Sequence, residues 1–378
     1  MEKIAIFGGT FDPVHKEHIE MATAVIKELN LDKLIVMPTF SPPHKTHSES
    51  ASATDRYNML CLAFDGLPVE ISDYEIVNGG KSYTYKTVEH FAELYKNVTL
   101  YFIVGDDMLT DFKTWRFPER ILDKATLAVF GREGQKADYD GEMEYFERTF
   151  GKRFLRLNYV GKDLSSTKIR VYSAFCLPID GLTSPKVAEY ISEKCLYAGG
   201  TPETVARINL PKKRLKHTAN VVITALKKEK VLSLNREKVI TACALHDVAK
   251  YMDEKNFPQG IIPADMPAPV RHAFLGEYYA RETVGITDPD VLNAIKYHTS
   301  GRPNMSLLEK IVFVADMIEE DRDYDGVDVL RKSYEEDDFE TCFRLCLKEE
   351  MLHLKNKNAQ IYQETINAYE YYIKEKNL

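Results

Sequence analysis

The segment Ile4-Ala5-Ile6-Phe7-Gly8-Gly9-Thr10-Phe11-Asp12-Pro13-Val14-His15-Lys16-Glu17-His18 decides how the first half of the chain folds. Its first four residues are apolar, as in a buried strand, and the Gly pair allows the backbone to turn sharply. Apolar residues then recur at helical spacing as far as Leu29. A strand, a tight turn and a helix direct backbone N–H groups and the positive helix end to one place, which suits a phosphate.

Two histidines stand in the first turn of this predicted helix. His15 and His18 are three residues apart, so their side chains lie on one side of the helix, next to the predicted anion site. For the spacing H-x-x-H alone, an ordinary strand–helix unit with two surface histidines is the alternative. The turn itself supplies further predicted substrate-binding residues, namely Gly8, Gly9, Thr10 and Phe11.

Length and composition restrict the class of protein. The 378 residues exceed the usual size of a single core, so two domains are expected. No apolar run is long enough to span a membrane, and the formal charge of −8 argues against general nucleic-acid binding. The start of the chain leads straight into a predicted strand rather than a signal peptide, and the six cysteines lack disulfide spacing. We therefore expect a cytoplasmic protein with buried, reduced thiols.

Strand-like and helical segments alternate through the first half. The run 98–104 is continuously apolar, as in a central parallel strand, and it ends at the sheet edge where α/β proteins bind ligands. Gly105 and Asp107 are therefore predicted substrate-binding residues, and the only tryptophan, Trp115, follows within ten residues. The pattern predicts a Rossmann-like domain with a parallel sheet. Its strands are expected at 4–7, 33–37, 68–71, 98–104 and 126–130. Its helices are expected at 54–65, near 140–150 and near 185–195, with a further helix that residues 82–87 cap and that runs to about Tyr95.

Three further motifs offer groups that bind phosphate. The proline-rich loop 38–45 projects His44 and Lys45, a cationic pair. The hydroxyls of 82–87, Thr84 among them, are expected to cap the helix that follows. In Ser165-Ser166-Thr167-Lys168-Ile169-Arg170, the two serines are suited to cap a helix that faces an anion, and Arg170 can add a bidentate contact.

These motifs occur in the order GGTFDPVHxxH, SPPHK, SYTYKT, GDDM with Trp115, and SSTKIR, over residues 1–197. In this they resemble the bacterial nicotinate-nucleotide adenylyltransferases. The resemblance implies transfer of AMP from ATP to nicotinate mononucleotide with Mg²⁺, giving deamido-NAD and pyrophosphate. It implies that His15 and His18 contact the triphosphate and that Ser165, Ser166 and Arg170 hold its distal end. Thr84, Trp115 and the loop 43–45 would contact the acceptor, for which nicotinamide mononucleotide is the alternative.

Two positions depart from that family: Lys86 replaces the acidic residue that commonly follows SYT, and Glu17 lies within the histidine motif. The family usually has H-x-G-H, whereas position 17 here is glutamate, which adds bulk and negative charge beside a polyphosphate. We expect Glu17 to point outward, where a first-turn glutamate suits the helix dipole.

The second half changes character after Ala198-Gly199-Gly200-Thr201-Pro202, which is typical of a linker. Strand patterns stop there, so the predicted domains are 1–197 and 203–378, with 198–202 between them. The second domain is expected to be all-α. Its predicted helices are 212–229, 235–250, 269–283, 289–299, 305–319, 338–352 and 360–375.

Polar residues interrupt the apolar runs of this half. His246-Asp247 stands within an otherwise apolar helical segment, and Asp316 ends the apolar run 311–315. Buried polar groups are costly unless they are satisfied, and a metal ion would satisfy them. His217 precedes them on the first long helix, and His272 and His298 add two more imidazoles.

The order His217…His246-Asp247…Asp316 resembles the HD phosphohydrolase superfamily over residues 203–375. HTSGRP at 298–303 and ADMIEEDR at 315–322 resemble the bacterial HD family that cleaves diadenosine tetraphosphate symmetrically into two ADP. The resemblance implies an ion at His217, His246, Asp247 and Asp316, with Asp247 catalytic and His272 and His298 available for a second ion. That ion is typically iron in the family, although mixed imidazole and carboxylate ligands also suit Mn or Zn. Substrate contacts are implied for Lys250, His272, His298, Arg302 and Arg322.

The sequence therefore predicts a bifunctional enzyme. Its expected partners are ATP, nicotinate mononucleotide and dinucleoside polyphosphates, with no nucleic acid and no membrane, and self-association into a homo-oligomer is left open. Two alternatives concern the second domain: hydrolysis of another nucleotide such as an alarmone, or a regulatory metal-binding module.

Overall fold

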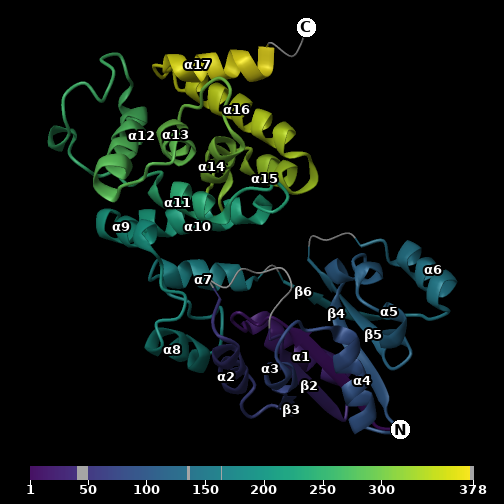
Figure 1. The fold of residues 1–378 in the computed structure, drawn as a ribbon. Helices are drawn as coiled ribbons and strands as arrows, with labels where there is room; N and C mark the ends of the chain where they lie inside the picture. The colour runs from purple at the N-terminus through teal and green to yellow at the C-terminus, as the bar shows by residue number, and fades with distance from the viewer. Residues whose placement is uncertain (41–49, 134–136, 163, 375–378) are drawn as a thin grey trace. The chain divides into compact units, whose positions relative to one another are not determined.

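The computed structural model describes residues 1–40, 50–133, 137–162 and 164–374 (Figure 1). The chain divides into two compact units. The first comprises Met1–Arg170 and Ile179–Tyr197, and the second comprises Val171–Pro178 and Ala198–Leu378. This division departs from the expected one at Val171–Pro178, which the sequence placed in the first domain. The expected linker also differs, because a helix, α9 (Thr201–Asn209), begins inside it.

The first unit contains a sheet of six parallel strands in the order β3-β2-β1-β4-β5-β6 (Figure 1). β1 lies between β2 and β4, with Ile4 opposite both Lys33 and Leu100. The strand order reverses at β1, and such switch points are where parallel α/β sheets bind ligands. The predicted Rossmann-like α/β fold is confirmed. The strands are β1 (Lys3–Gly9), β2 (Lys33–Pro38), β3 (Val69–Ile71), β4 (Thr99–Gly105), β5 (Thr126–Arg132) and β6 (Leu155–Gly161).

Helices cover both faces of the sheet. Alternate residues of β1 show this division, since Ala5 and Phe7 belong to one core and Ile4 and Ile6 to the other. The first core also holds residues of α1 (Lys16–Leu29), α2 (Ala53–Ala63) and α8 (Pro185–Glu193). The second holds residues of α4 (Thr84–Leu94), α5 (Pro118–Leu122) and α6 (Tyr139–Phe150). Two further helices are α3 (Tyr74–Asn78) and α7 (Ser166–Ala174).

Strand β6 was not predicted. It pairs with β5 alone, and the register between them shifts at Val129/Gly131. Its residues LRLNYVG alternate between polar and apolar and are largely exposed or half-buried. An edge strand of this kind lacks the continuous apolarity by which the central strands were identified.

The second unit is helical, as predicted for its fold class (Figure 1). Two helices were not anticipated, α9 and α15 (Val327–Glu336). The predicted helix 235–250 ends earlier, because the backbone after Leu245 forms turn bonds from Val248 N to Leu245 O and from Lys250 N to Asp247 O. The remaining helices are α10 (Lys212–Lys228), α11 (Arg236–Leu245), α12 (Ala268–Tyr279), α13 (Pro289–Tyr297), α14 (Leu307–Ile318), α16 (Phe339–Asn356) and α17 (Gln363–Tyr369).

Two sequence expectations concern the whole chain. All six cysteines are free, but only Cys243, Cys342 and Cys346 are buried, so the expectation of buried thiols is wrong for the other three. Within the described residues, none of the helices combines the length and apolarity needed to cross a membrane.

Candidate functional sites

The turn after β1 is shaped by Gly9 and Phe11. A Cβ atom on Gly9 would lie 3.0 Å from Phe11 Cζ, so glycine allows the ring to fold over the strand end. Phe11 has a φ of 47° and packs edge-on against Phe7 at 5.1 Å between ring centroids. Arg56 donates to the carbonyl oxygen of Thr10 at 2.8 Å and so fixes the far side of the turn.

His15 and His18 come together at the start of α1. The backbone N–H of His15 donates to His18 Nδ1 at 3.1 Å, and the two rings stack with centroids 3.6 Å apart. Because Nδ1 of His18 accepts this bond, its Nε2 carries the proton and can donate to an anion. Burial lowers the pKa of His15 to about 3 and holds the pKa of His18 well below its usual value. Both imidazoles are therefore neutral near pH 7.

A cation that the sequence reasoning missed lies at the same sheet edge. After burial, the charge of Arg132 is what lowers the pKa of His15, and it also lowers that of His18. Arg132 is the last residue of β5. Its side-chain Nη1 atom lies 3.4 Å from Asp107 Oδ2, and its backbone N–H donates to Asp106 Oδ2 at 3.3 Å. The signal for it was available, because Arg132 follows the predicted strand 126–130 by two residues, at the sheet edge that carries Asp107.

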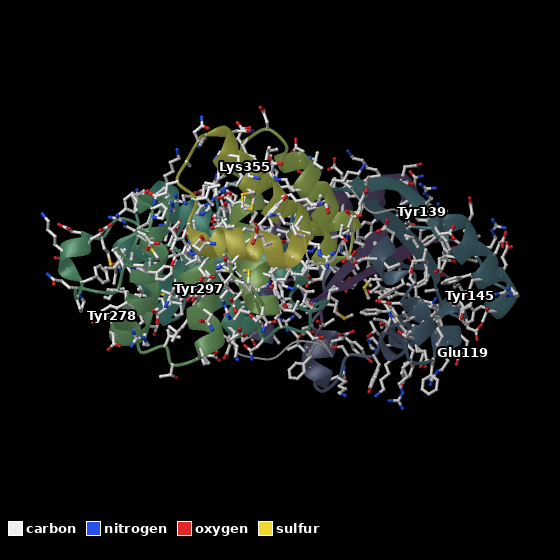
Figure 2. All side chains as sticks on the ribbon, turned by 90° about the horizontal axis from the view of Figure 1, so that it is seen from above. Glu119, Tyr139, Tyr145, Tyr278, Tyr297 and Lys355 are labelled. Atoms are coloured by element: carbon white, nitrogen blue, oxygen red, sulfur yellow. The ribbon has the colours of Figure 1, made fainter. Side chains whose placement is uncertain are left out.

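Buried Asp106 ties this edge together. Its Oδ2 atom also accepts from the hydroxyl of Tyr139 at 3.1 Å. Tyr139, labelled in Figure 2, is the first residue of α6. This carboxylate therefore connects the end of β4 with β5 and α6. It holds Arg132 at the carboxyl end of β5, beside Asp107. Gly105 is the last residue of β4 and immediately precedes Asp106.

The motif at 165–170 meets the turn after β1. Ser165 Oγ accepts from Lys168 N at 3.3 Å and so caps α7, as predicted. Ser166 Oγ donates to the carbonyl oxygen of Pro13 at 2.9 Å, and Arg170 Nη1 donates to that of Asp12 at 2.6 Å. The two motifs with the clearest phosphate-binding pattern therefore lie in direct contact.

Of the residues predicted to contact the acceptor, the structure describes Thr84 and Trp115. Thr84 begins α4, but the expected hydroxyl cap is absent there, since Tyr83 makes no capping bond and Ser82 Oγ instead accepts from Phe40 N at 3.1 Å. Trp115 is half-buried and packs against Phe102 and Phe112, with centroid distances of 6.3 and 5.2 Å. His44 and Lys45 lie outside the described residues.

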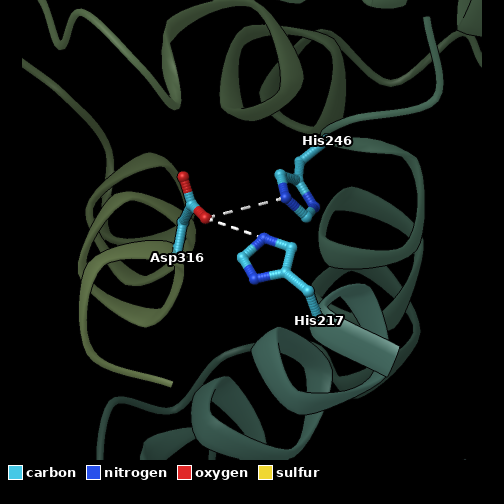
Figure 3. A group of neighbouring side chains, drawn as sticks. All are labelled: His217, His246 and Asp316. Atoms are coloured by element: carbon cyan, nitrogen blue, oxygen red, sulfur yellow. Dashed lines mark ion pairs between the residues drawn. The ribbon is translucent and has the colours of Figure 1, made fainter. Parts of the chain in front are cut away.

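In the second unit, His217, His246 and Asp316 converge (Figure 3). They come from α10, from the turn directly after α11 and from α14. Asp316 Oδ1 lies 3.0 Å from His217 Nε2 and 3.9 Å from His246 Nε2. One carboxylate oxygen thus faces two imidazole nitrogens.

Asp247 joins this group to a second one. Its Oδ2 lies 3.4 Å from His246 Nε2, and its Oδ1 lies 3.0 Å from His272 Nε2 and 3.6 Å from His298 Nε2. His246, Asp247 and His298 also have the spacing of a metal-binding group. The early end of α11 explains this arrangement, because residues 246 and 247 lie in a turn and both side chains reach the cluster.

The other ring nitrogens of the histidines are held by acceptors. His246 Nδ1 lies 2.6 Å from Cys243 O and His298 Nδ1 2.7 Å from Ile295 O, so each Nδ1 carries the proton and donates it. His217 Nδ1 likewise faces Glu319 Oε1 at 3.0 Å. The Nε2 atoms of His246 and His298 therefore present lone pairs. His217 instead lies between two carboxylates, with Nε2 3.0 Å from Asp316 Oδ1, and although burial opposes it, the hydrogen bonds with Asp316 and Glu319 raise its pKa. A metal ion at His217 Nε2 would replace the proton shared with Asp316, and a carboxylate behind a histidine is a common support for metal ligands. Glu319 was not predicted, although it belongs to ADMIEEDR.

These groups fit a divalent metal ion. The Nε2 atoms of His217 and His246 and Oδ1 of Asp247 are buried and complete no hydrogen bond of suitable geometry. Although burial opposes it, the imidazole of His246 holds the pKa of Asp247 well below its usual value, so the carboxylate is ionised. Burial lowers the pKa of His246 and lowers that of His272 to about 4. Ionised carboxylates and neutral imidazoles are the forms that bind metals.

Cations surround the cluster. Arg214 Nη1 lies 2.9 Å from Asp247 Oδ2, and Arg322 pairs with Asp316. Lys250 Nζ lies 3.1 Å from His272 Nε2 and 3.4 Å from Asp247 Oδ1. Three cationic side chains thus contact the carboxylates of the cluster.

A cavity of about 260 Å³ adjoins the cluster through Lys250 and His272. Arg271 and Glu254 supply its other charged groups, at 3.3 Å from each other, and the remaining lining is largely apolar. Arg302, which was also predicted to contact substrate, forms an ion pair with Glu309. Both arms of its guanidinium bind buried Glu309, at 2.7 and 2.6 Å.

Comparisons with known proteins agree with both sites. Residues 6–171 match the cytidylyltransferase-like family, and residues 214–321 match the HD domain. A "Probable nicotinate-nucleotide adenylyltransferase" of Clostridium tetani is 42% identical over 172 residues, which cover 45% of this chain and 86% of the relative. The chain belongs to the nicotinate-nucleotide adenylyltransferase family. It also carries an HD domain, so we call the two units the adenylyltransferase unit and the HD unit.

Two further similarities come from Clostridium acetobutylicum. A protein with the same name as the first relative is 39% identical over 199 residues, which cover 52% of this chain and the whole of the relative. A crystal structure titled "predicted HD superfamily hydrolase involved in NAD metabolism" is 32% identical to this chain. It covers 46% of this chain and 95% of its own, with a TM-score of 0.40.

Proposed function

We propose that the adenylyltransferase unit transfers AMP from ATP to nicotinate mononucleotide. The observation that carries this proposal is the junction of the two phosphate-binding motifs, where Ser166 and Arg170 contact the turn that leads to His15 and His18. The similarity to nicotinate-nucleotide adenylyltransferases over most of their length supports the choice of acceptor.

The reaction requires alignment and charge stabilisation rather than a covalent intermediate. A phosphate oxygen of the acceptor bonds to the α-phosphorus of ATP while the bond from that phosphorus to the bridging β-oxygen breaks, and pyrophosphate leaves. The Nε2–H of His18 would donate to the triphosphate, and Arg132 would supply positive charge as negative charge develops. Mg²⁺ bound with ATP would neutralise phosphate oxygens.

We also propose that the HD unit hydrolyses diadenosine tetraphosphate symmetrically, giving two ADP. The carrying observation is the pair of candidate ligand groups that share His246, bordered by Arg214, Arg322 and Lys250. A divalent ion, which we propose to be iron, would polarise phosphate oxygens and lower the pKa of water there. His217, His246, Asp247 and Asp316 would hold it, and His272 and His298 could hold a second.

The chain's own residues would perform the remaining tasks. Water adds to one of the two central phosphorus atoms, and the bond to the central bridging oxygen breaks, so the second ADP leaves with that oxygen. Lys250 and Arg214 would bind the phosphates beside the cluster, where cations reduce the repulsion between oxygens. The adjoining cavity lies beside Lys250 and His272, in reach of one arm of a dinucleotide.

Two variants test the two activities separately. The His18→Ala variant should lose adenylyl transfer from ATP to nicotinate mononucleotide and keep release of ADP from diadenosine tetraphosphate. The Asp247→Ala variant should lose bound metal and hydrolysis and keep adenylyl transfer. Equal loss of both activities in either variant would contradict two independent sites.

The same assays distinguish the alternatives. Replacing nicotinate mononucleotide by nicotinamide mononucleotide tests the acceptor, and a nucleotide panel that includes alarmones tests the HD substrate. Loss of metal in Asp247→Ala with no change in any hydrolysis rate would instead assign the HD unit a regulatory role. Metal analysis of protein purified without oxygen tests iron against manganese and zinc.

A further inference from the structure

Glu17, which departs from the family pattern, does not point outward as expected. Its Oε1 atom accepts a hydrogen bond from the backbone N–H of Lys162 at 3.0 Å and another from the hydroxyl of Tyr159. Tyr159 lies in β6, and Lys162 follows the last residue of that strand. The carboxylate therefore joins the first turn of α1 to the end of β6.

The chain beyond Lys162 leads directly to the second phosphate motif. Ser165 caps α7 three residues later, and Ser166 and Arg170 contact the carbonyl oxygens of Pro13 and Asp12. The end of β6 and the start of α7 are thus each attached to the β1–α1 region. Glu17 makes the attachment at the β6 end.

The charge of Glu17 is satisfied within this contact. Two donors meet its carboxylate, and the Lys162 ammonium lies 3.7 Å from Glu20 Oε2, one turn further along α1. Glu17 stands between His15 and His18 in sequence, but the charge that lowers the pKa of both imidazoles is that of Arg132. The contacts of Glu17 thus indicate a role in geometry rather than in the electrostatics of the histidines.

We propose that Glu17 is a positioning residue for ATP. By holding Lys162 and Tyr159, it sets the distance between the Ser165–Arg170 motif and the histidines of α1, and so the fit of the triphosphate between them. This inference rests on the proposed adenylyl transfer. It also explains why a glutamate beside the polyphosphate site is tolerated, since its oxygen is directed to β6 and not to the ligand.

Steady-state kinetics of the full chain test the proposal. Glu17→Ala should raise the KM for ATP about tenfold, as expected for the loss of a charged acceptor, with a small change in kcat. Glu17→Gln keeps an oxygen acceptor for both donors and should recover most of the ATP affinity. Tyr159→Phe should give an intermediate KM, and adding it to Glu17→Ala should cause no further rise. Glu20→Gln is the matched control on the same helix and should leave the KM for ATP unchanged.

Hydrogen exchange supplies a readout that does not depend on activity. The amide of Lys162 should exchange faster in Glu17→Ala than in the wild type and in Glu20→Gln. An unchanged KM for ATP and unchanged exchange in Glu17→Ala would overturn the inference. Absence of adenylyl transfer in the wild type would overturn the proposed function instead, while the exchange measurement would still report whether Glu17 holds the segment.

Discussion

Replacing Glu319 by glutamine should weaken metal binding in the HD unit without removing any proposed metal ligand. Glu319 Oε1 accepts from His217 Nδ1 at 3.0 Å, while its Oε2 accepts from Asn220 Nδ2 at 3.1 Å and from Asp321 N at 2.8 Å. Although burial opposes it, the bond from His217 lowers the pKa of Glu319, so the group is an ionised acceptor. Every donor in its surroundings faces a carboxylate oxygen.

The size of the effect follows from these contacts. A glutamine keeps one oxygen and exchanges the other for an NH₂ group, which must then face either His217 Nδ1–H or the donors on Asn220 and Asp321. In either rotamer the new NH₂ group faces another donor. His217 then loses either the hydrogen bond that orients its ring or the charge of its acceptor. Loss of such support typically costs about 10- to 100-fold in metal affinity, or about 1.4 to 2.7 kcal/mol.

The assay is an anaerobic titration of the chelator-treated full chain with Fe²⁺ or Mn²⁺, followed by metal analysis and thermal unfolding. Glu335→Gln, an exposed glutamate on α15, is the matched control and should bind metal as the wild type does. Unfolding of the metal-free variants separates loss of fold from loss of affinity. Wild-type metal affinity in a folded Glu319→Gln variant would refute the reasoning that His217 is a ligand supported by Glu319.

Three further predictions concern Arg132, metal binding in the HD unit and the titration of His15. Arg132→Ala should raise the KM for ATP about tenfold in steady-state kinetics, and Arg132→Lys should recover part of it, because the site's histidines are neutral. Chelation should lower the temperature at which the HD unit unfolds in calorimetry, since Asp247 and its partners lose the ion that binds only the folded state. The free energy of unfolding should fall as the pH drops below 6.5, because His15 takes up a proton in the unfolded chain but resists it down to a pKa of about 3 when folded. At pH 5.5 this histidine alone accounts for about 1.4 kcal/mol, which denaturant titrations of the wild type and of His15→Asn can measure.

The fold class could be predicted because it depends on local patterns. Continuous apolar runs mark β1, β2, β4 and β5, and each is buried on both faces by helices. β6 escaped because it is an edge strand whose pairing with β5, not its own composition, makes it a strand. The end of α11 at Leu245 was missed for a related reason, since the turn bonds that follow depend on how His246 and Asp247 are held by distant residues.

The candidate sites were predictable where the sequence spacing is short. His15 and His18, or His246 and Asp247, are close in sequence, so one local element brings them together. Supporting residues such as Arg132 and Glu319 come from other elements. Their roles depend on which strands are neighbours in the sheet and on how α10 packs near the end of α14. The motif position of Arg302 likewise did not indicate its partner, since tertiary packing pairs its guanidinium with buried Glu309.

The structure also changes what the histidines are expected to contribute. The sequence predicts that His15 and His18 contact the triphosphate, and the structure adds that burial, with the charge of Arg132, keeps both neutral in the free protein. Neutral imidazoles offer direction rather than charge, because a fixed N–H can be aimed at one oxygen. Charge must then come from Arg132 and from the start of α1, where it does not vary with pH in the physiological range. In the HD unit the Nδ1–H groups of His246 and His298 donate to backbone carbonyl oxygens, so the Nε2 lone pair of each faces the cluster and can bind a metal ion.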